Sequence, residues 1–290
     1  MVYGARHPHR AAGGGRPAQP GRDLPGVDRG REVSGTPELP FVPAPGAAPL
    51  WRRVAAATEV QLRTTLGNGE QLLLQLAIPV LVLLLFTLAP ILDLGRGPRI
   101  AFVAPGVLAL AILSAAFTGQ AIATGFERRY GVLKLLGGTP LGRSGLLAGK
   151  TLGVLVTEVL QLVVLVAISL LLGWRPGAGW GLAIPLLVLG TIAFSGLGLL
   201  LAGTLRAEAT LGAANLLYLV LLVLGGVAFP IRLFPGWLQA ISAGLPITAL
   251  TDGLRTAFSG SGGIPWADGL ILAVWAAAGL GGAVLTFRWE

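Results

Sequence analysis

Six apolar runs, each close to the length that crosses a lipid bilayer, dominate residues 72 to 287. A transmembrane helix needs about 20 consecutive apolar residues, because each residue adds about 1.5 Å along the axis of the helix. Only 12% of the residues are charged, against about 25% in soluble domains, so most of the chain does not face water. We therefore expect an all-α membrane protein with six transmembrane helices, at approximately Leu72–Leu92, Ile100–Thr124, Leu146–Leu172, Leu182–Leu205, Leu211–Phe229 and Leu270–Phe287.

The positive charges indicate on which side of the membrane the termini lie. An even number of spans places both termini on one side, together with the connections that follow the second and fourth spans. That side holds 16 of the 21 lysines and arginines, and the opposite side holds five. Because cytoplasmic loops are enriched in Lys and Arg, we expect cytoplasmic termini and a multi-pass protein of the cell membrane. The net charge of +8 has the same explanation, so no nucleic-acid partner is expected.

The chain divides by composition into a tail and a membrane domain. Residues 1–48 are rich in Gly, Pro and Arg and contain too few apolar side chains to form a core, so we expect a disordered cytoplasmic tail. Residues 49–290 form the predicted six-span domain. At its start, Leu50–Leu66 has apolar residues on one helical face and charged residues on another, with Glu59 and Arg63 spaced for an i,i+4 ion pair. This pattern predicts an interfacial helix that lies on the membrane.

The segment Gly145–Thr151 superficially resembles a phosphate-binding loop. The loop requires G-x-x-x-x-G-K-[ST], but here only three residues separate Gly145 from Gly149, and a membrane-length apolar run follows. Cysteine is absent, and the two histidines lie in the tail. We therefore expect no catalytic residues, no metal site and no cofactor in this chain, which should neither bind nor hydrolyse ATP.

The connection after the second span is too long for a turn and too polar to be buried in lipid. The stretch from Glu127 to Leu136 is compatible with a helix, and two glycines follow it. Thr139 then offers an N-cap and Pro140 the first position of a new helix. We expect two short helices on the cytoplasmic surface that present charged side chains to another protein.

One carboxylate lies deep within a predicted span. Glu158 is near the middle of the third span, and Gln161 is three residues away, so the two side chains share a helical face. A charged group in the bilayer core is costly and marks a candidate functional site. Either the pair lines a transport path or meets a second copy, or Glu158 is protonated and held by neighbouring spans. Glycines in the last three spans allow close helix packing, either within the chain or between two copies.

Two sequence motifs on this six-span frame resemble the membrane subunit of ABC-2-type exporters, including the daunorubicin-resistance permeases and other drug and lipid exporters. The first motif lies in the connection after the second span, and the second follows the fifth span. The matching residues of the first are Glu127, Arg128, Gly131, Leu133, Leu136, Thr139, Pro140, Arg143, Gly149 and Lys150. Those of the second are Phe229, Pro230, Phe234, Pro235, Trp237, Leu238, Pro246, Thr248, Asp252, Leu254 and Arg255.

The resemblance implies a permease that exports a hydrophobic or amphipathic cargo, such as a drug, lipid or glycolipid. It implies that a separate ABC ATPase subunit binds ATP and Mg²⁺, that a second permease copy or close paralogue completes the path, and that lipids surround both. Lys150 would then reach lipid phosphates at the cytoplasmic surface. The candidate path residues are Glu158 and Gln161.

The resemblance also assigns residues to two further regions, a coupling helix and an outer re-entrant segment that closes the exit. The candidates for coupling to the ATPase are Glu127, Arg128, Arg129, Tyr130, Gly131, Thr139, Pro140 and Arg143. The candidates for the outer gate are Phe229, Pro230, Pro235, Trp237, Pro246, Asp252 and Arg255.

Two alternatives to an exporter subunit differ in their chemistry. An ion-coupled secondary carrier would use Glu158 as an intramembrane proton site, but it also predicts several charges in broken spans, and one charge is found. A membrane enzyme would need a constellation of catalytic side chains, which the spans do not contain.

Overall fold

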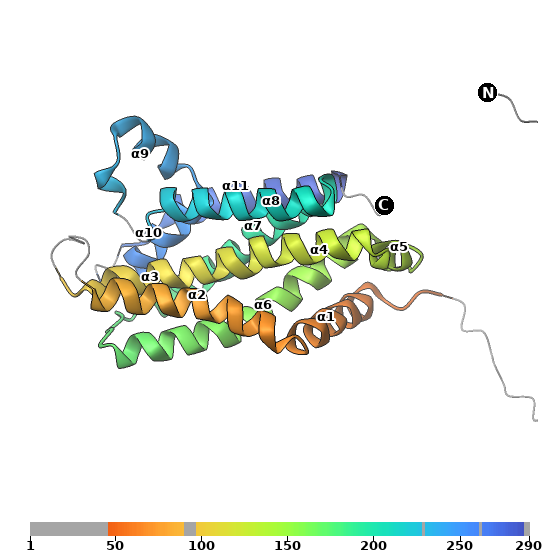
Figure 1. Cartoon of the computed structure of the whole chain (residues 1–290), viewed down its shortest axis with the longest axis horizontal. Coiled ribbons are helices and arrows are strands. Elements are labelled where there is room, and N and C mark those ends of the chain that lie inside the picture. Colours follow the sequence, from red (N-terminus) through yellow and green to blue (C-terminus); the bar gives the residue numbers. More distant parts are fainter. Residues whose placement is uncertain (1–45, 90–96, 228–229, 261–262, 287–290) are drawn as a thin grey trace, which may run out of the picture. The chain divides into compact units, whose positions relative to one another are not determined.

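The computed structural model describes residues 46–89, 97–227, 230–260 and 263–286, and residues from Ala47 onward form one compact unit. The predicted disordered tail therefore lies outside the described residues. Every regular element in these ranges is a helix, as the sequence predicts (Figure 1). The elements are α1 (Leu50–Leu66), α2 (Gly69–Leu88), α3 (Arg99–Ile112), η1 (Leu113–Gly119), α4 (Gln120–Arg129), α5 (Val132–Gly137), α6 (Gly142–Leu171), α7 (Trp180–Thr204), α8 (Ala207–Leu224), η2 (Ile231–Leu233), α9 (Gly236–Ala243), α10 (Pro246–Phe258) and α11 (Trp266–Thr286).

Five described helices are long and apolar enough to cross a membrane, so the chain is a multi-pass membrane protein. They are Arg99–Arg129, Gly142–Leu171, Trp180–Thr204, Ala207–Leu224 and Trp266–Thr286. The first predicted span corresponds to α2, whose described apolar stretch, Gln75–Leu88, is shorter than these five. The first span, and with it the total of six spans and the topology of the termini, stays a prediction.

The second span differs from the sequence prediction in its length and shape. Instead of ending at Thr124, one helix of 31 residues continues from Arg99 to Arg129, and it includes the π-helical segment η1. This helix is the centre of the bundle: 83% of its apolar window is buried, against 17% for α8 and 22% for α11. Its continuation carries Glu127 and Arg128 on the last turn of the span rather than on a separate surface helix.

Glycines allow α7 and α11 to pack at close range. A Cβ atom on Gly196 would lie 2.6 Å from the backbone nitrogen of Leu280, and one on Gly279 would lie 2.9 Å from that of Leu197. No larger residue fits at either position without separating the helices. The structure thus places these two glycines in packing within the chain, one of the two possibilities that the sequence left open.

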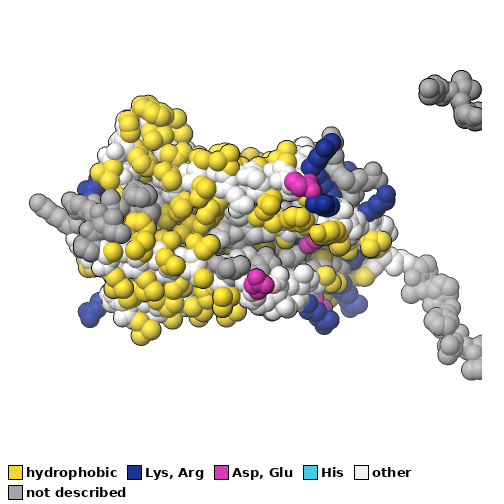
Figure 2. All heavy atoms as spheres, in the orientation of Figure 1, with side chains coloured by type: hydrophobic (Ala, Val, Ile, Leu, Met, Phe, Trp, Pro, Cys, Tyr) yellow, Lys and Arg dark blue, Asp and Glu magenta, His cyan; other side chains and the backbone are white. Residues whose placement is uncertain are grey.

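The helix α1 has the bounds predicted from the sequence and packs against the first half of α6. A Cβ atom on Gly149 would lie 2.6 Å from the Cβ of Ala57, and one on Gly153 would lie 2.5 Å from the Cγ of Gln61. Lysine and arginine side chains gather at the end of the bundle that carries α5, while hydrophobic side chains cover the middle (Figure 2). This distribution is typical of a protein whose middle faces lipid.

Prolines divide the segment between α8 and α11 into short helices, as predicted. Pro230 and Pro235 precede η2 and α9, and Pro246 is the first residue of α10. A proline fits before or within the first turn of a helix, because its missing N–H has no partner there, and in the helix interior it removes a backbone hydrogen bond and disfavours continuation. The short helices lie at the end of the bundle opposite α5 (Figure 1).

Candidate functional site

The predicted coupling region consists of the end of α4, the short helix α5 and the turn that leads into α6. Gly131 has a φ angle of +77° and separates α4 from α5. The single helix expected from Glu127 to Leu136 is therefore wrong, because the chain reverses at a left-handed residue that only glycine adopts readily.

The turn after α5 also differs from its prediction. The residues Thr139 and Pro140 do not cap a new helix: the Thr139 hydroxyl donates a hydrogen bond to the Leu136 carbonyl, 2.6 Å away, and α6 begins at Gly142. The Pro140 carbonyl accepts a hydrogen bond from Arg53 of α1. Arg143 lies on the exposed first turn of α6. The turn therefore ends α5 and connects it to α1.

Lys150 makes a buried ion pair instead of reaching lipid phosphates. Its Nζ lies 2.6 Å from Oε2 of Glu127 and donates a further hydrogen bond of 3.3 Å to Oε1 of Gln61. The Lys150 side chain is 5% exposed and that of Glu127 is 25% exposed. The predicted contact with lipid was wrong because α1 covers this face of α6, and the nearest anion is a side chain of α4.

Two arginines tie α4 to the beginning of α8. Arg128 donates a hydrogen bond to the Leu205 carbonyl, and Arg129 forms an ion pair with Glu208. Together with the pair of Glu127 and Lys150, these contacts fix the end of α4 against α6 and α8.

Besides the half-exposed Arg129, the coupling region presents to solvent the residues of α5 and the one that precedes its turn. Tyr130 is 73% exposed and Leu135 is 78% exposed, and Val132 and Lys134 are exposed between them. Leu133, in contrast, is fully buried and anchors α5 to the hydrophobic core on its inner face.

The phosphate-loop pattern is helical in the structure. Gly145–Thr151 lies within α6, where the backbone amides follow the helix and do not curl around an anion. Gly149 instead allows α1 to pack closely, and Lys150 forms the ion pair with Glu127.

Glu158 and Gln161 make contacts with different helices. Glu158 is 2% exposed, and its Oε2 shares a hydrogen bond with the hydroxyl of Thr191 on α7. Gln161 Nε2 donates to the carbonyl of Gln75 on α2, 2.9 Å away. The two side chains therefore lie on opposite sides of the α6 surface that faces the bundle, and only Glu158 lines the groove between α6 and α7.

A buried chain of hydroxyl and amide groups crosses the bundle near Lys150, and the sequence analysis missed it. Thr151 and Ser195 hydroxyl oxygens lie 2.8 Å apart, and Ser195 donates to Oε1 of Gln120, 2.9 Å away. The spacing of polar residues in the sequence could have indicated these contacts. Thr151 and Glu158 are seven residues apart on α6, and Thr191 and Ser195 are four residues apart on α7, so each helix carries two polar groups on one face.

A second groove, of about 530 Å³, lies among α2, η1 and α8 and is lined by polar side chains that the sequence analysis also missed. They are Asn68, Glu70, Gln75, Ser114, Thr118 and Asn215. Gln75, Ser114, Thr118 and Asn215 lie in largely apolar segments, and Asn68 and Glu70 lie in a polar turn before α2, so no motif revealed the set.

Arg255 organises the predicted outer segment, which lies between α8 and α11. Its Nη2 donates to the Gly226 carbonyl at 2.7 Å, its Nη1 pairs with Asp252 at 3.1 Å, and its guanidinium carbon lies 3.6 Å from the centre of the Phe102 ring. Burial lowers the pKa of Arg255 to about 10, although Asp252 opposes the decrease, so the guanidinium stays charged at neutral pH. The helix α10 is thereby attached to α3 and to the end of α8.

The other outer-gate candidates are more dispersed. Trp237 on α9 is 66% exposed, and Pro230, Pro235 and Pro246 mark the helix starts described above. Phe229 lies outside the described residues.

A comparison of the sequence with known families matches residues 52–259 to the ABC-2 type transporter family. The match covers the coupling region, the long central helix and the outer segment. The chain belongs to the ABC-2 type transporter family. It is 29% identical over 195 residues to the daunorubicin resistance ABC transporter permease protein DrrB1 of Streptomyces coeruleorubidus, which corresponds to 64% of this chain and 67% of that relative. As an ABC-2 family member, the chain is the membrane component of an ABC transporter.

Proposed function

We propose that this ABC-2 chain is the permease subunit of an ATP-driven exporter in the cell membrane, with both termini in the cytoplasm. A separate ATPase subunit binds and hydrolyses ATP with Mg²⁺, and the permease moves a hydrophobic or amphipathic cargo outward. The similarity to a relative named as a drug-resistance permease supports export as the direction of transport and a hydrophobic or amphipathic cargo.

The observation that carries this proposal is the way in which α5 is attached to the rest of the bundle. Three polar contacts of consecutive residues hold the end of α4 to α6 and α8, and beyond them Tyr130, at the end of α4, and Leu135, on α5, are exposed. A segment that is held rigidly transmits its displacement to the helices that hold it, whereas a mobile loop does not. Because exposed aromatic and aliphatic side chains on a rigid element form the centre of many protein interfaces, we assign them to the contact with the ATPase.

This assignment changes the roles of the coupling candidates. Glu127, Arg128 and Arg129 position α5, and the ATPase contacts Tyr130, Lys134 and Leu135. Gly131 supplies the left-handed turn that lets α5 fold back, while Thr139, Pro140 and Arg143 connect it to α6.

We further propose that a second copy of the permease covers the polar groove among α2, η1 and α8. Asn215 and Glu70 line this groove, and their polar groups would have no hydrogen-bond partners if the groove faced lipid hydrocarbon. The helix α8 has only 17% of its apolar window buried within the chain, so this face is available to a partner. The groove between the two copies then provides a polar route alongside apolar walls.

The test is a pull-down of the ATPase subunit by the full permease in detergent, with ATPase activity measured after reconstitution. We expect the double substitution of Tyr130→Ala and Leu135→Ala to weaken binding about tenfold or more, since interface anchors commonly contribute 2 kcal/mol or more each. The matched control is Leu233→Ala, which removes an exposed leucine at the opposite end of the bundle. Equal binding by the double variant and the control would refute the assignment of α5.

A further inference from the structure

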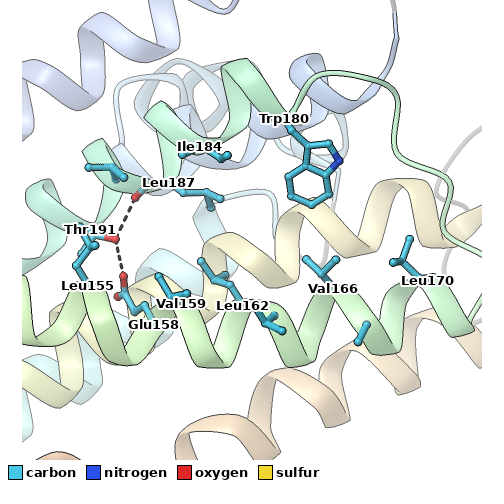
Figure 3. Close-up of a pocket in the computed structure, with 13 residues that line it drawn as sticks. Leu155, Glu158, Val159, Leu162, Val166, Leu170, Trp180, Ile184, Leu187 and Thr191 are labelled. Atoms are coloured by element: carbon cyan, nitrogen blue, oxygen red, sulfur yellow. Dashed lines mark hydrogen bonds between the residues drawn. The ribbon is translucent and has the colours of Figure 1, made fainter. Parts of the chain in front are cut away.

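Two cavities of the described structure differ in the charge of their walls. The groove of about 670 Å³ between α6 and α7 has almost entirely aliphatic walls, and Glu158, at one end of it, is hydrogen-bonded to Thr191 (Figure 3). Such walls accommodate any apolar chain and select none. A pocket of about 300 Å³ is different, because Arg99, Arg175 and Arg255 line it. This smaller pocket can distinguish ligands by their charge.

The arginine-lined pocket lies at the end of the bundle opposite α5, where α3 begins and α6 ends (Figure 1). Aromatic side chains form part of its wall, and the ring of Trp174 lies 5.0 Å from that of Phe258 in edge-to-face contact. Tryptophan is enriched at the level of the lipid headgroups, and two membrane-length helices, α6 and α7, end and begin beside this pocket. The pocket is therefore at the membrane surface, where phosphate is the anion that phospholipids present.

The three arginines come from separate parts of the chain. Arg99 is the first residue of α3, Arg175 lies between α6 and α7, and Arg255 lies on α10. The sequence analysis places five basic residues on this side of the membrane, and three of them line this one pocket. No acidic residue lines it in the part of the chain that the structure describes, and Asp252, which pairs with Arg255, compensates one of the three charges. Like charges that converge repel one another, so an anion between them lowers the free energy.

The chain around Arg175 is held in place although its side chain is exposed. On one side of it, Trp174 is 2% exposed, and its backbone N–H donates a hydrogen bond of 2.9 Å to the carbonyl of Ser169. On the other side, the backbone N–H of Gly177 donates one of 3.1 Å to the carbonyl of Phe258. The guanidinium of Arg175 is thus accessible on a fixed backbone, and little ordering is left to be done when an anion binds.

We propose that this pocket binds a phosphate group with a net negative charge, supplied by an anionic phospholipid of the adjoining leaflet or by phosphate in solution. Arg99 and Arg175 donate hydrogen bonds to the phosphate oxygens, and Arg255 supplies a fixed positive charge. Guanidinium groups bind phosphate through paired N–H donors, and basic pockets between transmembrane helices bind anionic head groups. Bound phosphate connects the start of α3 to the segment between α6 and α7. The site is separate from α5, and it does not depend on the cargo.

The experiment measures the binding of lipids to the full chain in detergent by native mass spectrometry. Phosphatidylglycerol and phosphatidylcholine with the same acyl chains are titrated separately. Both lipids contain a phosphate, but the choline group compensates its charge and would bring a further cation to the arginines. We expect phosphatidylglycerol to bind about tenfold or more tightly than phosphatidylcholine, as charge-assisted hydrogen bonds to a net anion require.

The double substitution of Arg99→Gln and Arg175→Gln should weaken the binding of phosphatidylglycerol about tenfold or more and remove its preference over phosphatidylcholine. Arg232→Gln is the matched control, because Arg232 is an exposed arginine between α8 and α11 that does not line the pocket. It should bind both lipids as the wild-type chain does. If the double variant fails to fold, Arg175→Gln alone decides, since this exposed side chain can be replaced without disturbing the core.

Equilibrium dialysis of the same protein against radiolabelled inorganic phosphate separates the two sources. Saturable binding that the double variant loses identifies phosphate in solution as a ligand, whereas a preference for phosphatidylglycerol without such binding identifies the lipid. Equal affinity for the two lipids, together with no binding of inorganic phosphate, would overturn the proposal. So would a loss in Arg232→Gln as large as that in Arg175→Gln, because it would show a general attraction of anions to this surface. Neither assay contains an ATPase, so a failure here is distinct from a failure of the α5 pull-down.

Discussion

A buried lysine and a partly buried arginine hold the two ends of this molecule together in different ways. Near α5, Lys150 pairs with Glu127 and with an amide oxygen, so side chains of α6, α4 and α1 meet at one point charge. At the opposite end, Arg255 binds the backbone carbonyl of Gly226 and lies against the Phe102 ring, with Asp252 as its charged partner. The lysine connects side chains, whereas the arginine connects backbone segments.

The difference shows what each end of the molecule can do. An ammonium is a compact charge on a flexible stem, and it can keep its partner while the helices around it shift. A guanidinium has donors in a fixed plane and needs its acceptors in fixed places. The end with Lys150 is thus joined at a point charge shared by three helices, and at the end with Arg255 the planar donors keep the short helices between α8 and α11 in place.

Replacing Arg255 should have the largest effect on stability. In Arg255→Leu, the Gly226 carbonyl and Asp252 lose their donor, and each hydrogen bond to a charged group contributes about 1.5–3 kcal/mol. We expect a loss of several kcal/mol in the free energy of unfolding, measured by SDS titration in mixed micelles. Arg255→Lys should recover only part of it, because lysine keeps the charge but not the planar fork. Arg175→Ala, an exposed arginine at the same end, is the control, and full recovery by lysine would contradict the comparison.

Breaking the pair of Lys150 and Glu127 should have an intermediate effect. Lys150→Met leaves a partly buried carboxylate without its cation, at a cost of about 1–3 kcal/mol or somewhat more for a charged group. The double variant with Glu127→Gln should be more stable than Lys150→Met alone, because it removes the charge that was left unpaired. A double-mutant cycle measures the coupling, and strictly additive effects would mean that the two side chains do not interact.

The exposed pair of Arg63 and Glu59 on α1 should contribute least. The two side chains are 80% and 61% exposed, and the pair has the i,i+4 spacing predicted from the sequence. Arg63→Ala should change the free energy of unfolding by at most about 0.5 kcal/mol, and added salt should remove that difference. A larger, salt-independent loss would show that α1 depends on this charge as it does on Lys150.

Features that depend on a few neighbouring residues could be predicted from the sequence. Apolar composition sets the position of the membrane-length helices, because each helix satisfies its own backbone hydrogen bonds. The breaks at Pro230, Pro235 and Pro246 follow from the missing N–H of proline. The spacing of Glu59 and Arg63 was sufficient for their ion pair, and the order of two motifs was sufficient for the family.

Features that depend on how helices face one another were decided by the tertiary structure. Lys150 and Glu127 are 23 positions apart in the sequence and meet because the end of α4 lies against α6. Glu158 and Gln161 share a helical face by spacing, yet one contacts α7 and the other α2. The sequence by itself determined which segments are helices, since helix formation depends on local backbone chemistry, but helix ends such as Arg129 and Gly142 differed from the prediction. Only packing decided which polar side chains became partners, because the rotation of each helix about its axis depends on every neighbour that it touches.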